Sequence, residues 1–170
     1  MNNDKFILDA TAGFRMMWFN KQHPNTIYLD ERPECEPDIV GDFCDLKQFA
    51  DETFRLIVFD PPHILRKDTF GGSGLRTAYG WLTPETWQDT LKNGFAECWR
   101  VLKPYGVLLF KWSNTNIPSN KVLKYAPTKP LFYQITAVKP QKVSGNKHIK
   151  DLWFCFMKIP ESEKSAVIGD

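Results

Sequence analysis

Short apolar runs separated by turn residues recur along most of this 170-residue chain. Continuous apolar runs of this length are typical of strands that are buried inside a sheet. Together they favour an open α/β sheet. The predicted strands cover residues 5–9, 26–30, around 38–41, 54–59, 106–112, 131–138 and 152–158.

Between the fourth and fifth runs, apolar residues recur at spacings of four and three, which predicts a helix. Thr83 is a suitable N-cap because proline follows it at the first helical position, and Lys103-Pro104 ends the pattern. Residues 107–110 are continuously apolar, so the helix is expected to lead into a buried parallel strand. The predicted buried face of the helix holds Trp87, Leu91, Phe95, Trp99 and Leu102.

Carboxylates follow three of the predicted strands, and the first two are Asp9 and Asp30. Asp9 opens a turn that reaches Gly13, after which residues 14–19 are expected to start a helix. An acid about 20 residues beyond such a turn, as Asp30 is, can accept hydrogen bonds from ribose hydroxyls. Gly13 lacks the further glycines of a dinucleotide fingerprint, and no P-loop motif occurs. Because ligands bind at the carboxyl ends of strands in such sheets, a nucleotide-type site is predicted there.

The third carboxylate belongs to Asp60-Pro61-Pro62-His63, directly after the fourth apolar run. Two prolines remove two backbone N–H donors and fix φ near about −65°, so Asp60 should lie in a stiff turn. The Asp60 carboxylate and the Pro61 carbonyl could then both accept hydrogen bonds from one amino group. The alternative is that the prolines simply end a strand.

The order and spacing of these motifs resemble the class I S-adenosylmethionine-dependent methyltransferases. Asp-Pro-Pro followed by an aromatic residue is typical of the members that methylate N6 of adenine or N4 of cytosine. The chain looks most like small phage and mobile-element methyltransferases that carry Phe-Asp-Pro-Pro-His. The resemblance covers about residues 6–158 and rests on Asp9-Ala10-Thr11-Ala12-Gly13, Asp30, Gly41-Asp42-Phe43, Asp60 to His63 and Arg100 to Gly106.

The resemblance implies a Rossmann-like fold with a seven-stranded, mostly parallel sheet, helices on both faces and a C-terminal antiparallel hairpin. It also implies S-adenosylmethionine as the cofactor and direct methyl transfer without a covalent enzyme intermediate. The length fits one domain over residues 1–170, with residues 159–170 as a loose tail and no separate target-recognition domain. Specificity is therefore expected to be short, or to come from a partner or a second subunit.

Residue roles follow from the same resemblance. The positions implied for cofactor binding are Asp9, Ala10, Thr11, Gly13, Asp30, Asp42, Phe43 and Asp60. Of these, Asp9 and Gly13 would line the methionine end, Asp30 would bind the ribose, and the Asp42–Phe43 pair would bind adenine. The positions implied for catalysis are Asp60, Pro61, Pro62 and His63.

Two positions depart from the family pattern. His63 stands where the amino-methyltransferases usually have Tyr, Phe or Trp for stacking on the base. It could stack by its ring face, or it could hydrogen-bond an acceptor and titrate near neutral pH. Arg15 stands where the first motif usually has its second glycine, which changes the expected geometry of the cofactor loop.

The net charge of +2 conceals a strong asymmetry. Residues 1–62 hold 12 acids and 6 bases, whereas residues 111–150 hold eight lysines and no acid. Lysines interleaved with aromatic residues suit phosphate contacts and base stacking, although a solvated basic surface is the simpler alternative. The chain is expected to be cytosolic and not to bind membranes, since its four cysteines are scattered and no targeting or spanning segment occurs. Three histidines without suitably spaced acids or thiols predict no metal site.

The segment from His63 to Leu82 contains Gly71-Gly72-Ser73-Gly74 together with basic and aromatic residues. It could be a lid that closes on an extruded base, or a surface loop. The residues expected to contact the substrate are Arg66, Lys67, Tyr79, Trp81, Lys111, Trp112, Lys147 and His148.

Three functions remain from the sequence. The first is an amino-methyltransferase of nucleic-acid bases, with DNA favoured over RNA and a homodimer as an option. The second is a methyltransferase with a small-molecule or protein acceptor. The third is a non-catalytic nucleic-acid-binding protein with a degenerate cofactor site. This function is disfavoured because the motif acids are all retained, namely Asp9, Asp30, Asp42 and Asp60.

Overall fold

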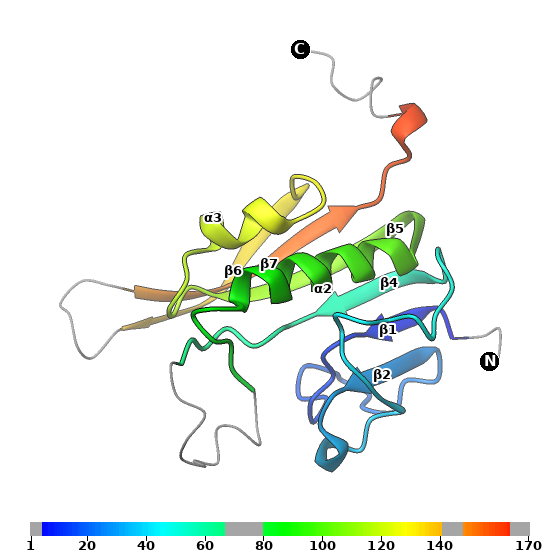
Figure 1. The fold of residues 1–170 in the computed structure, drawn as a ribbon, viewed down its shortest axis with the longest axis horizontal. Helices are drawn as coiled ribbons and strands as arrows, with labels where there is room; N and C mark the ends of the chain where they lie inside the picture. Colours follow the sequence, from blue (N-terminus) through cyan, green and yellow to red (C-terminus); the bar gives the residue numbers. More distant parts are fainter. Residues whose placement is uncertain (1–4, 67–79, 141–147, 164–170) are drawn as a thin grey trace.

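The computed structural model describes residues 5–66, 80–140 and 148–163, and it contains a seven-stranded sheet (Figure 1). The strand order is β3-β2-β1-β4-β5-β7-β6, and every neighbouring pair is parallel except those that β7 makes with β5 and β6. This is the expected mixed sheet with a C-terminal antiparallel pair. The strands are β1 (Ile7–Asp9), β2 (Thr26–Asp30), β3 (Ile39–Val40), β4 (Phe54–Phe59), β5 (Leu102–Ser113), β6 (Phe132–Pro140) and β7 (His148–Met157).

The helical elements include α2 (Trp87–Val101), α3 (Ser119–Val122) and the short 3-10 turns η1 (Pro33–Cys35) and η2 (Leu123–Tyr125), and residues 161–163 are also helical. Helix α2 lies across β4 and β5, with α3 beside it (Figure 1). The rings of Trp87 and Tyr125 join the two helical segments edge to face at 5.8 Å. Alternate residues of β5 are completely buried beneath them: Leu108, Phe110 and Trp112.

Helix α2 begins at Trp87 and not directly after Thr83 as expected. Residues 84–86 form a turn instead, in which the Thr83 carbonyl accepts the Trp87 N–H and the Thr83 and Thr86 hydroxyls are 2.7 Å apart. The helix ends at Val101, and β5 starts at the next residue because Leu102 pairs with Phe54. The strand is thus four residues longer at its start than predicted.

The expected helix over residues 14–19 is wrong, since the structure has turns there. Arg15 adopts a φ of +55°, which a continuing right-handed helix does not permit. The Trp18 indole is also bonded to Asp9, whose side chain alternates with Leu8 and so points away from the sheet face that α2 covers. Turns held by individual hydrogen bonds therefore replace a helix after β1.

The segment between β3 and β4 also lacks an α-helix, and α2 supplies the hydrogen bonds that fix it. The Arg100 guanidinium donates to the carbonyls of Leu46 and Phe49 at 3.0 Å. Glu97 accepts the Leu46 N–H at 2.8 Å and pairs with Arg100 at 2.8 Å. These bonds satisfy backbone groups that a helix would otherwise pair internally. They hold residues 46–53 against the last turn of α2, next to the starts of β4 and β5.

Candidate functional site

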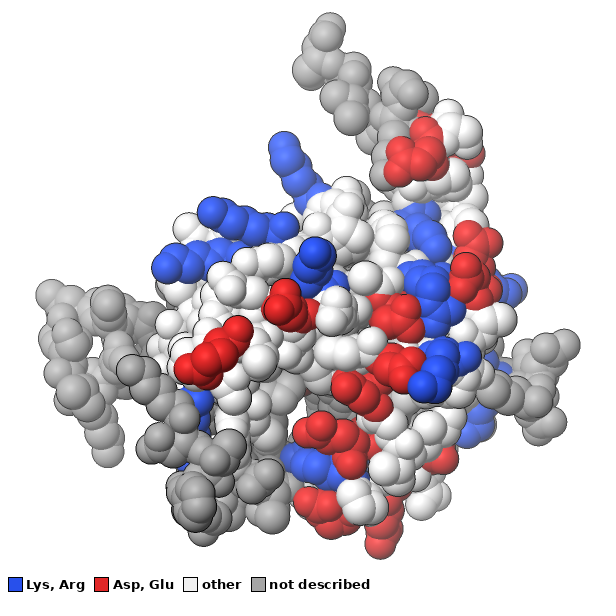
Figure 2. Space-filling view, viewed as in Figure 1, with Lys and Arg blue, Asp and Glu red and all other residues white. Residues whose placement is uncertain are grey.

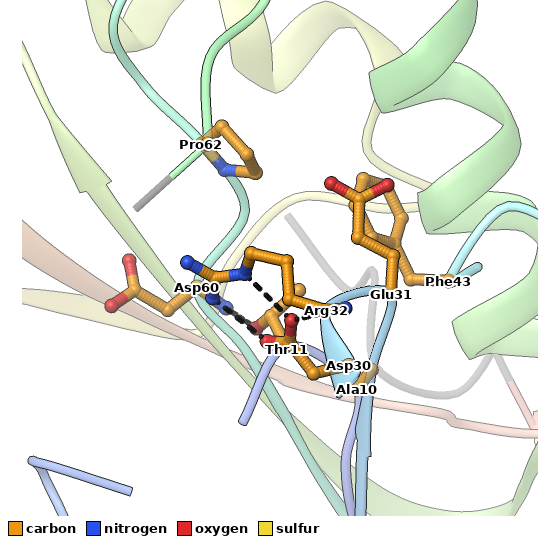
Figure 3. A pocket seen from close by; sticks show the side chains of 9 residues that line it. Ala10, Thr11, Asp30, Glu31, Arg32, Phe43, Asp60 and Pro62 are labelled. Atoms are coloured by element: carbon orange, nitrogen blue, oxygen red, sulfur yellow. Dashed lines mark hydrogen bonds and ion pairs between the residues drawn. The ribbon is translucent and has the colours of Figure 1, made fainter. Parts of the chain in front are cut away.

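The motif residues meet where β1, β2 and β4 end. The register pairs Asp9 with Tyr28 on one side and with Val58 on the other, so the three strands finish at nearly the same level. Figure 3 shows the side chains of Thr11, Asp30 and Arg32 close together at this edge, with the Asp60 carboxylate directed away from them. A cleft at this edge is lined by Ala10, Thr11, Asp30, Glu31, Arg32, Phe43, Asp60, Pro62 and Gly80.

Thr11 connects the turn after β1 to the Asp-Pro-Pro motif. Its hydroxyl oxygen accepts the Asp60 N–H at 2.7 Å, and the Ala10 N–H donates to the Val58 carbonyl at 2.9 Å. The first proline after Asp60 is buried and the second lines the cleft. The backbone of Asp60 is therefore held by the Thr11 hydroxyl on one side and by the two prolines on the other. The sequence prediction included the prolines but not the bond to Thr11.

The Asp60 carboxylate is half-buried and forms an ion pair with Lys111. The Lys111 ammonium lies 2.7 Å from Asp60 Oδ2 and comes from β5, the next strand of the sheet. Lys111 was expected to contact the substrate, and the structure does place it in the site. Its position beside the motif carboxylate arises from the β4–β5 register.

Asp30 has its hydrogen-bonding capacity taken up within the protein. Arg32 Nε donates to Oδ1 at 2.8 Å, Arg32 Nη2 donates to Oδ2 at 3.0 Å, and the Gly13 N–H donates to Oδ2 at 2.7 Å. Burial acts to raise the pKa of Asp30, but these hydrogen bonds outweigh burial and the pKa is lowered. The carboxylate that was expected to bind ribose thus holds the Gly13 turn and Arg32 together.

Glu31 is the acid that sequence reasoning missed. Its side chain is exposed and lines the same cleft as Phe43 and Pro62 (Figure 3). It follows Asp30 directly, and the presence of Arg32 one residue later was the available signal. An Asp followed closely by an Arg can be neutralised within its own turn, as Asp30 is by Arg32, whereas Glu31 is an exposed carboxylate on the wall of the cleft.

Asp9 is fully buried and lines neither cavity of the site. Its Oδ2 accepts the Trp18 indole N–H at 2.6 Å, and its Oδ1 accepts the Thr11 N–H at 3.2 Å. Burial raises the pKa of Asp9 to about 7, despite the opposing effect of both hydrogen bonds. Asp9 was expected to line the methionine end of the cofactor. The structure instead buries its carboxylate behind the turn that follows β1.

Asp42 and Phe43 lie in the turn after β3. Asp42 is exposed and accepts the Cys44 N–H, whereas Phe43 lines the cleft and meets the Phe59 ring edge to face at 5.2 Å. A Cβ added to Gly94 of α2 would lie 2.7 Å from the Phe43 ring. The missing side chain of this helical glycine is what lets the Phe43 ring pack there.

His63 and Trp112 lie together but outside both cavities. Their rings are 6.2 Å apart in an edge-to-face arrangement. Trp112 is completely buried, and its indole N–H donates to the Ile117 carbonyl at 2.9 Å. Trp112, which was expected to contact the substrate, is therefore a core residue: alternation along β5 turns it toward α2 and Lys111 away from it.

The remaining substrate candidates lie at the base of the 63–82 segment or outside the described residues. Arg66 lies over the Trp81 ring at 5.8 Å, and the Arg66 N–H donates to the Leu82 carbonyl. Leu65 and Leu82 form a bridge that joins the two ends of this segment next to the cleft. Lys67, Tyr79 and Lys147 fall outside the described residues, as does the glycine-rich part of the proposed lid, and His148 is the first residue of β7.

Arg15 stands where the family pattern has a second glycine, and its side chain lines neither the cleft nor the wider cavity next to it. Its guanidinium lies over the Tyr28 ring at 4.0 Å and donates to the carbonyls of Lys21 and Glu36. Its backbone nevertheless adopts the left-handed conformation that a glycine at this position would take easily. The substitution therefore preserves a sharp turn and moves the side chain to the far side of β2.

A second, wider cavity adjoins the cleft. The cleft itself has a volume of about 40 Å³, whereas the second cavity has a volume of about 450 Å³. They share Thr11, Arg32 and Asp60, so together they form one continuous site. The wider part is lined by Thr11, Ala12, Gly13, Phe14, Met16, Met17, Arg32, Asp60 and Lys111.

In residues 5–66, 80–140 and 148–163, no three His, Cys, Asp or Glu side chains gather as they would around a metal ion. The helices of these same ranges are all too short or too polar to cross a bilayer.

No protein-family model matches the sequence, and no curated protein matches it either. Solved structures do share its fold. A SAM-dependent methyltransferase from Methanosarcina mazei aligns over 95% of both chains with 14% identity and a TM-score of 0.55. An rRNA methylase from Streptococcus thermophilus aligns over 94% of this chain and 90% of its own, with 11% identity and a TM-score of 0.50.

TrmN from Thermus thermophilus aligns over 90% of this chain but 43% of its own length, with 14% identity and a TM-score of 0.52. At such low identities the shared property is the fold. The chain thus has the Rossmann-like fold of class I methyltransferases, as the order of its motifs predicted.

Proposed function

We propose that the chain is an S-adenosylmethionine-dependent methyltransferase that methylates an exocyclic amino group of a nucleic-acid base, adenine N6 or cytosine N4. DNA is the favoured polymer, with RNA second. The observation that carries this proposal is the position of Asp60. Asp60 lies at the carboxyl edge of the sheet and lines both cavities, and its backbone N–H is bonded to the Thr11 hydroxyl.

The residues around the cleft fit this cofactor in chemical type. Glu31 supplies a carboxylate for the ribose hydroxyls, and Phe43 and Pro62 supply apolar surface for adenine. The backbone of the Thr11–Gly13 turn lines the site, so that a ligand can approach it closely. We assign the ribose contact to Glu31 because Asp30 is already paired with Arg32. When bound, the cofactor supplies an electrophilic methyl group on a sulfonium sulfur.

The exocyclic nitrogen of a base is a weak nucleophile because its lone pair is delocalised into the ring. Acceptance of its N–H groups by the Asp60 carboxylate and the Pro61 carbonyl favours a pyramidal nitrogen with a localised lone pair. The nitrogen would take the methyl group from the sulfonium, whose sulfur would keep the electron pair of the broken C–S bond, and the Asp60 carboxylate would accept the proton that the nitrogen releases. Positioning of this kind contributes ~7–11 kcal/mol in favourable cases, and proton transfer roughly 10²–10⁴-fold.

A polymeric acceptor is supported by the distribution of charge. Lys121, Lys124 and Lys129 are exposed on and after α3, and Figure 2 shows basic side chains gathered in this region. Phosphate groups are the natural partners of such a cluster. The fold shared with an rRNA methylase is compatible with the same class of acceptor.

The proposal is tested by methyl transfer from labelled S-adenosylmethionine to DNA and RNA, followed by nucleoside mass analysis. Asp60→Asn should lower transfer at least about 100-fold, because both proton acceptance and amine positioning are lost. Binding of S-adenosylhomocysteine should change less than about twofold, since the bond to Thr11 uses the Asp60 backbone. Asp45→Asn, an exposed carboxylate on the turn after β3, is the matched control and should leave transfer unchanged.

Three results would contradict parts of this proposal. Undiminished transfer by Asp60→Asn would remove the motif from catalysis. Cofactor binding without label in either polymer would favour the small-molecule or protein acceptor that the same site could serve. An inability to bind the cofactor at all would overturn the methyltransferase assignment.

A further inference from the structure

We propose that the 450 Å³ cavity receives the acceptor base, and that Phe14 supplies the aromatic contact that the Asp-Pro-Pro motif lacks. The cavity lies between the Phe14–Met17 segment and the Asp60–Lys111 ion pair. This inference rests on the proposed function, because it names the acceptor subsite of that reaction. Its volume lies within the range of small-molecule sites, about 300–1,000 Å³.

One wall of the cavity is apolar and open to solvent. Phe14 is 46% exposed, Met16 is 75% exposed and Met17 is 38% exposed, and all three line the cavity. Large apolar side chains gathered at a polar site indicate a surface that a ligand covers. Methionine also contacts aromatic rings favourably and adapts to their shape.

This wall is anchored at both ends. The Gly13 N–H donates to Asp30 at 2.7 Å just before the segment, and the Trp18 indole donates to Asp9 at 2.6 Å just after it. Arg15, inside the segment, is fixed over Tyr28 on the other side. The exposure of Phe14 thus belongs to a segment that is bonded in place, and its ring can act as a preformed contact.

The opposite end of the cavity carries the Asp60 carboxylate and the Lys111 ammonium, 2.7 Å apart. They present a hydrogen-bond acceptor next to a donor. Adenine and cytosine present the complementary pair, an amino group next to a ring nitrogen acceptor. Uracil and thymine have a carbonyl in place of that amino group, so the pair selects amino-bearing bases.

The usual stacking residue cannot serve from its motif position in this arrangement. His63 meets the edge of the buried Trp112 at 6.2 Å and lines neither cavity. An aromatic contact is available from the other side of Asp60, on the turn after β1. His63 in the motif therefore packs against Trp112, whereas Phe14 lines the cavity and can contact the base.

The test uses a short single-stranded oligonucleotide with one 2-aminopurine, a fluorescent adenine analogue, in the presence of S-adenosylhomocysteine. Phe14→Ala should weaken oligonucleotide binding about 5- to 150-fold, because base stacking contributes ~1–3 kcal/mol. It should also reduce the fluorescence change that reports enclosure of the base. Phe19→Ala is the matched control, since Phe19 is in the same region, is fully exposed and lies outside the cavity.

The variants also separate the subsite from the reaction. Methyl transfer that depends on Asp60 but is unaffected by Phe14→Ala would overturn the subsite and leave the proposed function intact. A loss of S-adenosylhomocysteine affinity in Phe14→Ala equal to the loss for the oligonucleotide would assign the cavity to the cofactor instead. Equal effects of Phe14→Ala and Phe19→Ala would also overturn the proposal. Phe14→Leu should recover part of the binding by apolar contact, which distinguishes lost contact from misfolding.

Discussion

Asp9 shows how a motif residue can serve the site without touching a ligand. Its carboxylate is buried under the turn that it precedes, and it accepts one hydrogen bond from Trp18 and one from Thr11. Thr11 in turn accepts the Asp60 N–H. Asp9 is therefore two hydrogen bonds away from Asp60, and its protonation state affects the support of the whole turn.

The raised pKa of Asp9 predicts a specific dependence of stability on pH. In the unfolded chain the carboxyl titrates near its ordinary value of 3.8, whereas in the folded chain it titrates at about 7. Between these values the folded state binds the extra proton, so this contribution to stability falls as pH rises from about 4 to 7 and is constant above. The total is on the order of a few kcal/mol, since each pKa unit corresponds to about 1.4 kcal/mol.

Thermal unfolding of Asp9→Asn against the parent protein between pH 5 and 8 measures this effect. The Tm advantage of the parent over the variant should be largest near pH 5 and should shrink toward pH 8. Asp89→Asn, which removes an exposed acid from the first turn of α2, is the control for the loss of one carboxylate. A pH-independent difference for Asp9→Asn would contradict the assigned titration.

Helix α2 shapes the cleft from a distance through Gly94. Glycine inside a helix costs about 1 kcal/mol relative to alanine, so its presence needs a packing reason. The reason is the Phe43 ring, which lies 2.7 Å from the position that a Cβ would occupy, with the Phe59 ring at 2.8 Å. The glycine lowers the helix propensity of α2, but it leaves room for the Phe43 ring to form one wall of the cleft.

Gly94→Ala should displace Phe43 and weaken binding of S-adenosylhomocysteine about 10-fold, measured by calorimetry. Overpacking costs typically 1–3 kcal/mol, which exceeds the gain in helix propensity, so the free energy of unfolding in urea should also fall. Asn93→Ala, at an exposed position of the same helix, should raise stability slightly and leave ligand affinity unchanged. Unchanged affinity in Gly94→Ala would show that Phe43 does not form the adenine wall.

The elements could be predicted to different extents for identifiable reasons. Strands β2 and β4 were placed correctly to the residue, because most of each strand is a short run of buried apolar side chains. The turns after β1 could not be predicted, since the conformation of Arg15 depends on Tyr28 and on carbonyls distant in sequence. The same limit applies to the Lys111–Asp60 pair, which depends on the register of β4 against β5.

At the scale of the whole molecule, the described basic side chains are unevenly distributed. Figure 2 shows basic side chains gathered over the α3 side, whereas acidic and basic side chains are mixed over the rest of this face. The site lies at the carboxyl edge of the sheet.

This arrangement predicts a localised salt dependence of nucleic-acid binding. The double substitution of Lys121 and Lys124 by Gln should reduce the slope of log K against log salt by about 1.4 for a single-stranded oligonucleotide, given ~0.7 per phosphate contact. The same double substitution at Lys21 and Lys47, which are also exposed, should leave the slope unchanged. Equal slopes for the two double variants would show that the α3 lysines make no phosphate contacts.

The bonds from Arg100 and Glu97 to residues 46–49 also determine the order in which the molecule can be completed during synthesis. Their partners are separated from them by 51 or more residues, so the amino-terminal strands emerge well before α2 can hold the segment between β3 and β4. At roughly 5–20 residues per second, the ribosome needs several seconds to supply α2. Until then the Leu46 and Phe49 carbonyls must remain hydrated. The half of the molecule that carries most of the proposed cofactor site therefore acquires its final form only after the helix that follows it has been made.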